Sequence, residues 1–260
     1  MGGTFASPLS ADQAQSLFGI KERGNLSDVI GYLAYSQTEI GKTGTWTEYA
    51  KLVDETASTT IGTPVDPQIT HVKRWATWKI EHGDQFHIDV ISSPELNDER
   101  MQAIQDVVFS KGTLAPDEKT LYKGWYGAIS STKNAKFPMS IDLRTVRSYD
   151  GTGHILIELT HLKNPDGYVA FTKSVSDKEI HTLLQSKITV YNVENLSIDD
   201  FKRVLRHELG HAFGLSHSDD PDDLMYEIVK TPYPYISQCD VDTLAGLYNG
   251  SETSWVSCET

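Results

Sequence analysis

Apolar and polar residues alternate along the middle of the chain, and this pattern predicts five β-strands. The segment DQFHIDVIS combines the alternation with β-branched residues and predicts a strand at residues 84–92. Four further segments carry the same signal, at residues 139–148, 154–161, 167–175 and 186–193. The tetrapeptide Asn-Pro-Asp-Gly at residues 164–167 is a strong turn signal between the third and the fourth of these strands.

Helical spacing predicts several helices beside these strands. Apolar residues recur every three or four positions in four segments: residues 27–40, 47–57, 94–110 and 115–131. In the last segment, Leu121, Trp125 and Ile129 would form one buried face. Strands and helices mixed in this way favour an α+β or α/β layered fold over a helical bundle or a β-sandwich.

The first 70 residues differ from the rest of the chain. They are rich in Gly, Ser and Thr, and they contain no motif with recognisable chemistry. A loop at residues 60–68 follows their last predicted helix. Since 260 residues suit one large domain or two small ones, we expect a boundary near residue 70.

The segment after the last predicted strand carries the clearest helix signals. Ser197 is a good N-cap, and Asp200 three residues later completes a start that resembles a capping box. A helix is therefore predicted over residues 198–213, with an apolar face made of Ile198, Phe201, Leu205, Leu209 and Ala212. Gly214 stands where this helix should end, because glycine adopts the left-handed conformation that terminates helices.

Three histidines on and after this helix have the spacing of metal ligands. His207 and His211 are four residues apart, so they project from one helix face and can reach a single ion. The turn at Gly214 would bring His217 back toward them. Three neutral imidazoles suit zinc and leave its fourth position open, as in a catalytic site, whereas structural zinc sites are closed and usually contain cysteine.

Glu208, directly after the first histidine, gives this arrangement a catalytic interpretation. Zinc lowers the pKa of bound water to about 7, and an adjacent carboxylate can take the proton during attack on a carbonyl and pass it to the leaving amine. A bare HExxH also arises by chance on amphipathic helices. The longer pattern HExxHxxGxxH fixes five positions on an independently predicted helix and favours the functional interpretation.

With this signature the sequence resembles the metzincin clan of zinc endopeptidases, which combines HExxHxxGxxH with a Met-turn. Met225, within DDLMYE, is similar to the Met-turn methionine, which lies beneath the metal as a hydrophobic base; a plain core residue would look the same. Ser218 after the third histidine and Tyr226 after the methionine resemble the matrixins, the matrix metalloproteinase family, as does the C-terminal segment SQCDVDTLAGLYNG. Astacins would instead have Glu after the third histidine and Tyr at position 227.

The resemblance implies the fold and the domain division. We expect an α+β catalytic domain at residues 71–260, with a twisted mixed sheet of about five strands, an active-site helix, a Met-turn and a C-terminal helix. Residues 1–70 would then be an accessory or propeptide-like region.

The resemblance also implies where substrate binds. The segment GYVAFT would be an edge strand above the cleft, so that an extended peptide adds to the sheet along Val169 and Ala170. The loop from Glu227 to Gln238 would wall the primed-side specificity pocket with Tyr233 and Tyr235, although simple loop packing explains these tyrosines equally well.

Two features expected of a matrixin are missing from the sequence, and a third, calcium binding, has candidate ligands. Matrixins carry a second, structural zinc, but the ligand spacing for it is missing, and His154 and His161 are more typical of structural or solvent-facing histidines. Calcium could bind an acidic loop that is otherwise simply solvated, formed by Asp219, Asp220, Asp222 and Asp223. The cysteine of a cysteine-switch propeptide is absent, so an acid such as Asp66 would have to enforce latency.

Charge and cysteine content restrict partners and location. The formal net charge of −13 and the lack of a basic patch exclude nucleic acid as an expected partner. No apolar run approaches the roughly 18 residues that span a bilayer. The opening residues lack the features of a secretory signal, so the protein is either cytoplasmic or has lost a leader. Cys239 and Cys258 could form a disulfide in an oxidising compartment or remain thiols, and neither belongs to the zinc motif.

These observations lead to one main hypothesis and one alternative. The main hypothesis is a secreted or envelope-facing zinc endopeptidase that acts on extended protein or peptide substrates, with Glu208 as general base and acid. The alternative is a zinc-stabilised protein-binding module without turnover. Glu208 favours the enzyme, and the oligomeric state is not indicated by the sequence.

Overall fold

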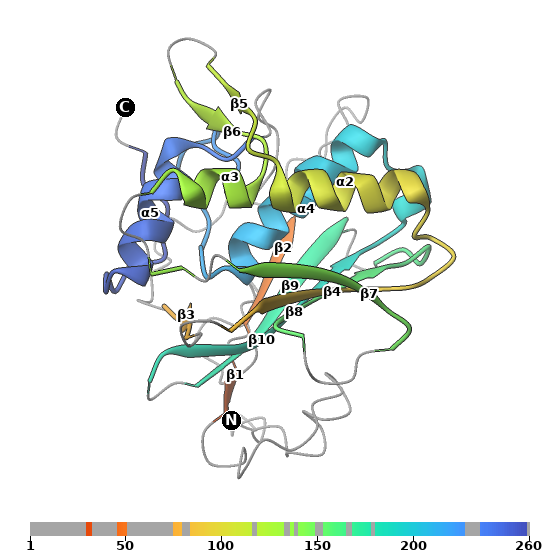
Figure 1. Cartoon of the computed structure of the whole chain (residues 1–260), viewed down its shortest axis with the longest axis horizontal. Coiled ribbons are helices and arrows are strands. Elements are labelled where there is room, and N and C mark those ends of the chain that lie inside the picture. Colours follow the sequence, from red (N-terminus) through yellow and green to blue (C-terminus); the bar gives the residue numbers. More distant parts are fainter. Residues whose placement is uncertain are drawn as a thin grey trace, which may run out of the picture.

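The five predicted strands form the centre of one mixed β-sheet in a computed structural model of the chain (Figure 1). The structure describes the backbone of residues 30–32 and 46–50, and residues 75–258 apart from short gaps at 80–83, 116–118, 133–135, 138–139, 149–152, 165–167, 178–179 and 227–234. The central strands are β4 (Phe86–Ile91), β7 (Ile141–Val146), β8 (Ile155–Leu159), β9 (Ala170–Asp177) and β10 (Thr182–Val190). The sequence prediction of these strands and of a mixed sheet is confirmed.

The strand order explains why the sheet is mixed. Along the sheet the central strands follow the order β9-β10-β8-β4-β7. The pairs β10–β8, β8–β4 and β4–β7 are parallel, whereas β9 runs antiparallel to β10. Parallel neighbours need a long crossover connection, and for the pair β4–β7 the segment that contains α2 and α3 supplies it. The antiparallel strand β9 returns to β10 through a short connection instead.

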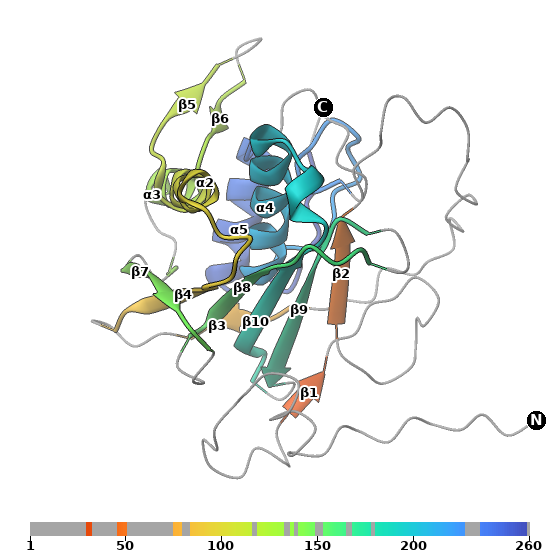
Figure 2. The same ribbon diagram turned by 90° about the vertical axis from the view of Figure 1, so that its right-hand side faces the viewer.

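Four helices cover one side of this sheet (Figure 2). They are α2 (Asp98–Phe109), α3 (Trp125–Ser130), α4 (Ile198–Ala212) and α5 (Gln238–Tyr248), and a 3₁₀ turn, Val193–Asn195, precedes α4. The helices and the sheet enclose one apolar core, which includes Phe86, Ile88 and Ile157 from the strands. Among the described helices, none has the length and apolarity needed to cross a bilayer.

The helix predicted at residues 115–131 is largely wrong. Among the described residues of this segment, Trp125–Ser130 alone is helical, and Leu121–Tyr122 is a short strand, β6, paired with β5 (Thr113–Leu114). Tyr122 also exchanges both backbone hydrogen bonds with Ile236, at 2.8 and 3.0 Å. These tertiary partners hold the segment extended up to Gly124, the N-cap of α3, although its side-chain spacing suits a helix.

The short helices predicted near the N-terminus are also not observed where the structure describes the chain. Ile30–Tyr32 forms β1 and Trp46–Ala50 forms β2, and both strands pair antiparallel with β9. A further short strand, β3 (Thr77–Trp78), pairs with β10. The expected loop at residues 60–68, with Asp66, lies outside the described residues. The domain division near residue 70 stays a prediction.

Candidate functional site

Helix α4 carries the first two candidate metal ligands, and its local sequence explains both of its ends. Ser197 caps it, since its hydroxyl accepts a hydrogen bond from the Asp200 backbone N–H at 3.1 Å. Apolar side chains such as Phe201 fix the orientation of the helix on the sheet. The chain then leaves the helix at Gly214, which has a φ of +110°, as predicted. A β-carbon there would lie 2.7 Å from the carbonyl oxygen of Ala76.

The turn at Gly214 brings the three candidate ligands together. The Nε2 atoms of His207 and His211 are 2.9 Å apart. The ring of His217 lies 4.8 Å from that of His211 and 5.6 Å from that of His207, centre to centre. One ligand nitrogen from each of the three histidines lies within 4.8 Å of the other two. The three imidazoles thus surround one point, as a metal ion requires.

Backbone carbonyls set the orientation of two of these rings. The Nδ1 of His207 lies 2.8 Å from the carbonyl oxygen of Leu224, and the Nδ1 of His211 lies 2.9 Å from that of Leu215. A carbonyl can only accept, so each Nδ1 donates a proton and each Nε2 keeps its lone pair for a metal. The Leu224 carbonyl belongs to the Met-turn segment, which therefore contacts the site directly.

Burial keeps the three imidazoles neutral. Desolvation lowers the pKa of His207 to about 4 and that of His217 to about 3, and it lowers the pKa of His211 well below its ordinary value. Neutral imidazoles are the form that binds metal. Three such donors, with the only cysteines of the chain joined in a disulfide, fit a zinc ion with an open coordination position.

Glu208 is buried beside the histidines and is held by a residue that the sequence did not single out. The hydroxyl of Thr172, on β9, donates to Oε2 of Glu208 at 2.6 Å. Thr172, Ala170, Ser174 and Ser176 are all buried, at every second position of the strand. Small residues at every second position of a strand allow a helix to approach that face closely. This alternation in the sequence was the signal that could have pointed to Thr172.

Met225 lies buried beneath helix α4, as expected of either a Met-turn methionine or a plain core residue. A β-carbon at Gly210 would be 2.5 Å from its sulfur, so the glycine between the two helical histidines makes room for it. The backbone N–H of Met225 donates to Oδ1 of Asp223 at 2.8 Å. This carboxylate is buried and thus serves the local turn.

The β9 edge next to Glu208 is not open in the whole chain, contrary to expectation. Strand β2 pairs with it antiparallel, with Glu48 opposite Thr172 and Ala50 opposite Ala170 (Figure 2). Val169, the other expected substrate-binding residue of this segment, accepts a hydrogen bond from the Tyr191 backbone. A segment of the chain itself therefore occupies the position expected for an extended substrate.

The loop expected to wall the specificity pocket is described only at its end. Tyr233 lies outside the described residues. The ring of Tyr235 lies 4.9 Å from the guanidinium carbon of Arg206, the residue before the first ligand. Arg206 also donates to the carbonyl of Lys123 at 2.8 Å, so α4 anchors this loop end and β6 together. Whether Tyr233 and Tyr235 contact substrate stays a prediction.

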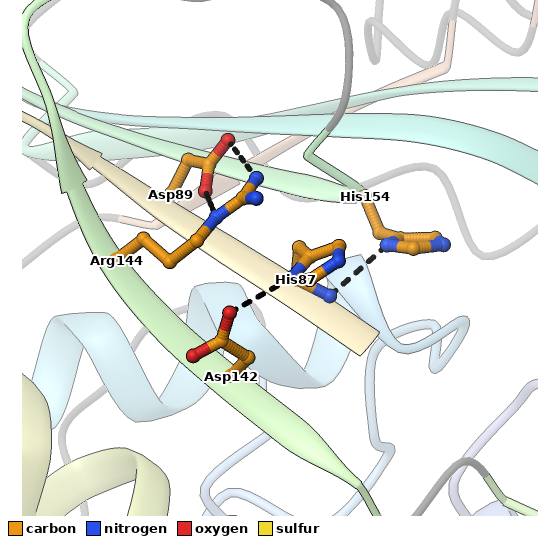
Figure 3. Close-up of polar contacts among 5 residues, drawn as sticks. All are labelled: His87, Asp89, Asp142, Arg144 and His154. Carbon is orange, nitrogen blue, oxygen red and sulfur yellow. Dashed lines mark hydrogen bonds and ion pairs between the residues drawn. The ribbon is translucent and has the colours of Figure 1, made fainter. Parts of the chain in front are cut away.

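His154 and His161, the two histidines considered for a second metal, have other polar partners in the structure. The Nδ1 of His154 accepts from the His87 backbone N–H at 3.0 Å, and His87 pairs with Asp142 at 3.1 Å (Figure 3). The Nδ1 of His161 lies 2.8 Å from Glu95. Within the described part of the chain, neither His154 nor His161 belongs to a group of three metal-ligand side chains. A second zinc thus gains no support from this region.

The acidic loop likewise shows no gathered calcium ligands among the described residues. Asp220 accepts a hydrogen bond from the Asp222 backbone at 2.9 Å, which is an ordinary turn contact. Asp223 groups with Cys239 and Cys258, but these cysteines are joined in a disulfide. Calcium binding remains a prediction.

Comparisons with known proteins agree with this geometry. Residues 132–249 match the family model for matrixin. A protein named "Probable matrix metalloproteinase 095L", from Invertebrate iridescent virus 3, is 32% identical over 109 residues, which are 42% of this chain and 27% of that protein. The "Interstitial collagenase" of Sus scrofa is 47% identical over 51 residues, or 19% of this chain and 11% of that protein.

The chain spans only about a quarter or less of the length of these relatives. The part that the family model matches includes the three histidines, Glu208 and Met225. Residues 132–249, a little under half of the chain, are therefore similar to the matrixins.

Proposed function

We propose that this protein is a zinc-dependent endopeptidase that hydrolyses peptide bonds of extended polypeptides. One observation carries the proposal: three neutral imidazoles surround one point, and the buried carboxylate of Glu208 lies on the same helix between two of them. A purely structural metal site needs no such carboxylate. The matrixin family is zinc-dependent, and the donor set here fits that ion.

Each residue has a defined task in this proposal. His207, His211 and His217 would hold zinc, which supplies a Lewis acid that polarises the scissile carbonyl and acidifies water. Glu208 would take the proton of the attacking water and pass it to the leaving amine. Thr172 would hold one carboxylate oxygen, so that the other points to the reacting atoms.

The substrate would bind as an additional strand on β9. Val169 and Ala170 would pair with its backbone, and the loop with Tyr233 and Tyr235 would contact the side chain beyond the scissile bond. Because β2 covers this edge in the whole chain, residues 1–70 would compete with substrate.

The proposed place of action is outside the cytoplasm, in an extracellular or cell-envelope compartment. The structure shows Cys239 bonded to Cys258, and disulfides persist in oxidising compartments. Matrixins are generally extracellular, which supports the same location.

The test compares wild type with Glu208→Gln, both with and without residues 1–70. Zinc content is measured by metal analysis, and activity is measured by cleavage of casein, gelatin and a peptide library. We expect wild-type zinc content in the variant and a loss of cleavage of at least about 100-fold, since general acid–base catalysis contributes roughly 10²–10⁴-fold. Equal cleavage by the variant would disprove the role of Glu208. A wild type that binds zinc but cleaves nothing, even without residues 1–70, would support the alternative of a silent binding module.

A further inference from the structure

The C-terminal tail, residues 254–258, lies against the loop that carries His217. The backbone N–H of Ser216 donates to the carbonyl of Ser254 at 2.8 Å. The backbone N–H of Val256 donates to the carbonyl of His217 itself at 3.2 Å. Ser254 and Val256 are both buried in this contact. The tail thus contacts the backbone of the third candidate ligand.

The Met-turn holds the same loop from its other side. Ser218 donates its backbone N–H to the carbonyl of Met225 at 2.8 Å and forms isolated bridges with both Tyr226 and Val256. His217 therefore belongs to the middle one of three short extended segments. Its backbone position depends on both neighbours, because it lies beyond the end of helix α4.

A disulfide fixes the end of the tail. Cys258 is bonded to Cys239 in the first turn of α5, with the two Cα atoms 5.3 Å apart. The sulfur of Cys258 also lies 3.5 Å from Oδ2 of Asp223. This carboxylate accepts hydrogen bonds from Met225 and from Ser237, the N-cap of α5. The disulfide thereby joins the tail to α5, and the hydrogen bonds of Asp223 link α5 to the Met-turn.

We infer that the disulfide-tethered tail, Ser254–Cys258, is a positioning element for the third metal ligand. The inference rests on the proposed metal site. The backbones of His207 and His211 are fixed by the hydrogen bonds of α4, whereas that of His217 is fixed by the tail and the Met-turn. Contacts around the ligands of metal sites typically change metal affinity by about 10- to 100-fold when they are lost. The two cysteines, which lie outside the zinc motif in sequence, thus act on the site through the backbone.

The first test removes the tether from the full chain. The double variant Cys239→Ser/Cys258→Ser is preferred to chemical reduction, because free thiols beside Asp223 could themselves bind zinc. Zinc affinity is measured by competition with a chromophoric chelator, and amide hydrogen exchange is measured on the metal-free protein. We expect about 10- to 100-fold weaker zinc binding and faster exchange at Ser216 and Val256. Ser257→Ala, an exposed neighbour in the tail, serves as the matched control and should match wild type.

The second test keeps the disulfide and removes one hydrogen bond. Val256→Pro lacks the N–H that donates to His217, so it should weaken zinc binding and alter the visible spectrum of bound Co²⁺, which reports coordination geometry. In the serine double variant the same substitution should add little, because the tail is already released. Unchanged zinc affinity in both variants would overturn the inference, even if exchange at Ser216 became faster.

The two proposals fail in different ways. A wild type that binds no zinc would disprove the proposed function, while the exchange comparison would still test the link between tail and loop. If the wild type binds zinc and both variants bind it equally tightly, only the positioning role of the tail is disproved.

Discussion

The hydrogen bond between Thr172 and Glu208 can be removed almost without changing shape. Thr172→Val replaces the hydroxyl by a methyl group, and the strand backbone keeps its pairing with Ile188 on β10. The hydroxyl lies 2.6 Å from Oε2 of Glu208, and both side chains are buried. The substitution therefore leaves one carboxylate oxygen without the group that now orients it.

The size of the effect follows from the charge of the acceptor. The Thr172 oxygen also lies 3.0 Å from the Glu208 carbonyl, but its single proton favours the charged carboxylate. Hydrogen bonds to charged groups contribute about 1.5–3 kcal/mol. Since about 1.4 kcal/mol corresponds to a factor of ten, we expect kcat to fall by roughly 10- to 150-fold.

Steady-state cleavage of a fluorogenic peptide, together with zinc analysis, checks this expectation. Thr172→Val should lower kcat with little change in KM and with full zinc content, because the hydrogen bonds of the Thr172 hydroxyl go to Glu208. Thr172→Ser retains the hydroxyl and should stay within about threefold of wild type, well inside the range of one lost hydrogen bond. A valine variant with full zinc and wild-type kcat would refute the positioning of Glu208 by Thr172, and a kcat loss that merely tracks zinc loss would do the same.

Three further outcomes are expected. Burial, and then the charge of Asp223, raise the pKa of Asp240 well above its ordinary value. The folded protein therefore binds this proton more tightly than the unfolded chain does. Its stability falls as pH rises from the ordinary pKa through the raised one. Asp240→Asn should therefore raise Tm more at pH 8 than at pH 4; an unchanged dependence of Tm on pH would contradict this. Removal of residues 1–70 uncovers β9 and should raise kcat/KM for extended peptides at least tenfold, whereas a chain that lacks only residues 1–29 keeps β2 and should match the whole chain. Gly214→Ala forces a side chain into a left-handed conformation and should cost about 1–3 kcal/mol in the free energy of unfolding, measured by urea denaturation; a cost near zero would show that the helix end can relax.

Local sequence patterns were sufficient for the elements that bury a continuous apolar face. The five central strands and α4 have a clear period, and the ligand pattern on α4 needs only the geometry of one helix and one glycine turn. His207, His211 and His217 could therefore be brought together from sequence alone. Their spacing lies within eleven residues, whereas the contacts of the tail and the Met-turn that hold the His217 loop could not be inferred from that spacing.

Features that depend on distant segments could not be predicted in the same way. Trp46–Ala50 is extended because β9 offers it an unpaired edge, and that edge is more than 100 residues away. Thr172 becomes important only when α4 lies on β9. The segment around Leu121 has helical spacing, but backbone pairing with Ile236 decides its conformation. In each case a tertiary partner outweighs the local pattern.

The pairing of β2 with β9 also bears on solubility. If residues 1–70 were removed, the outer edge of β9 would expose unpaired backbone groups along Ala170–Asp177. Such an edge accepts any extended chain, including the same strand of a second molecule, so a shortened protein would be prone to self-association. Lys173 in the middle of this strand is a charge of the kind that discourages edge-to-edge aggregation. The β9 edge that would bind a substrate is thus also an edge through which two molecules could associate when β1 and β2 do not pair with it.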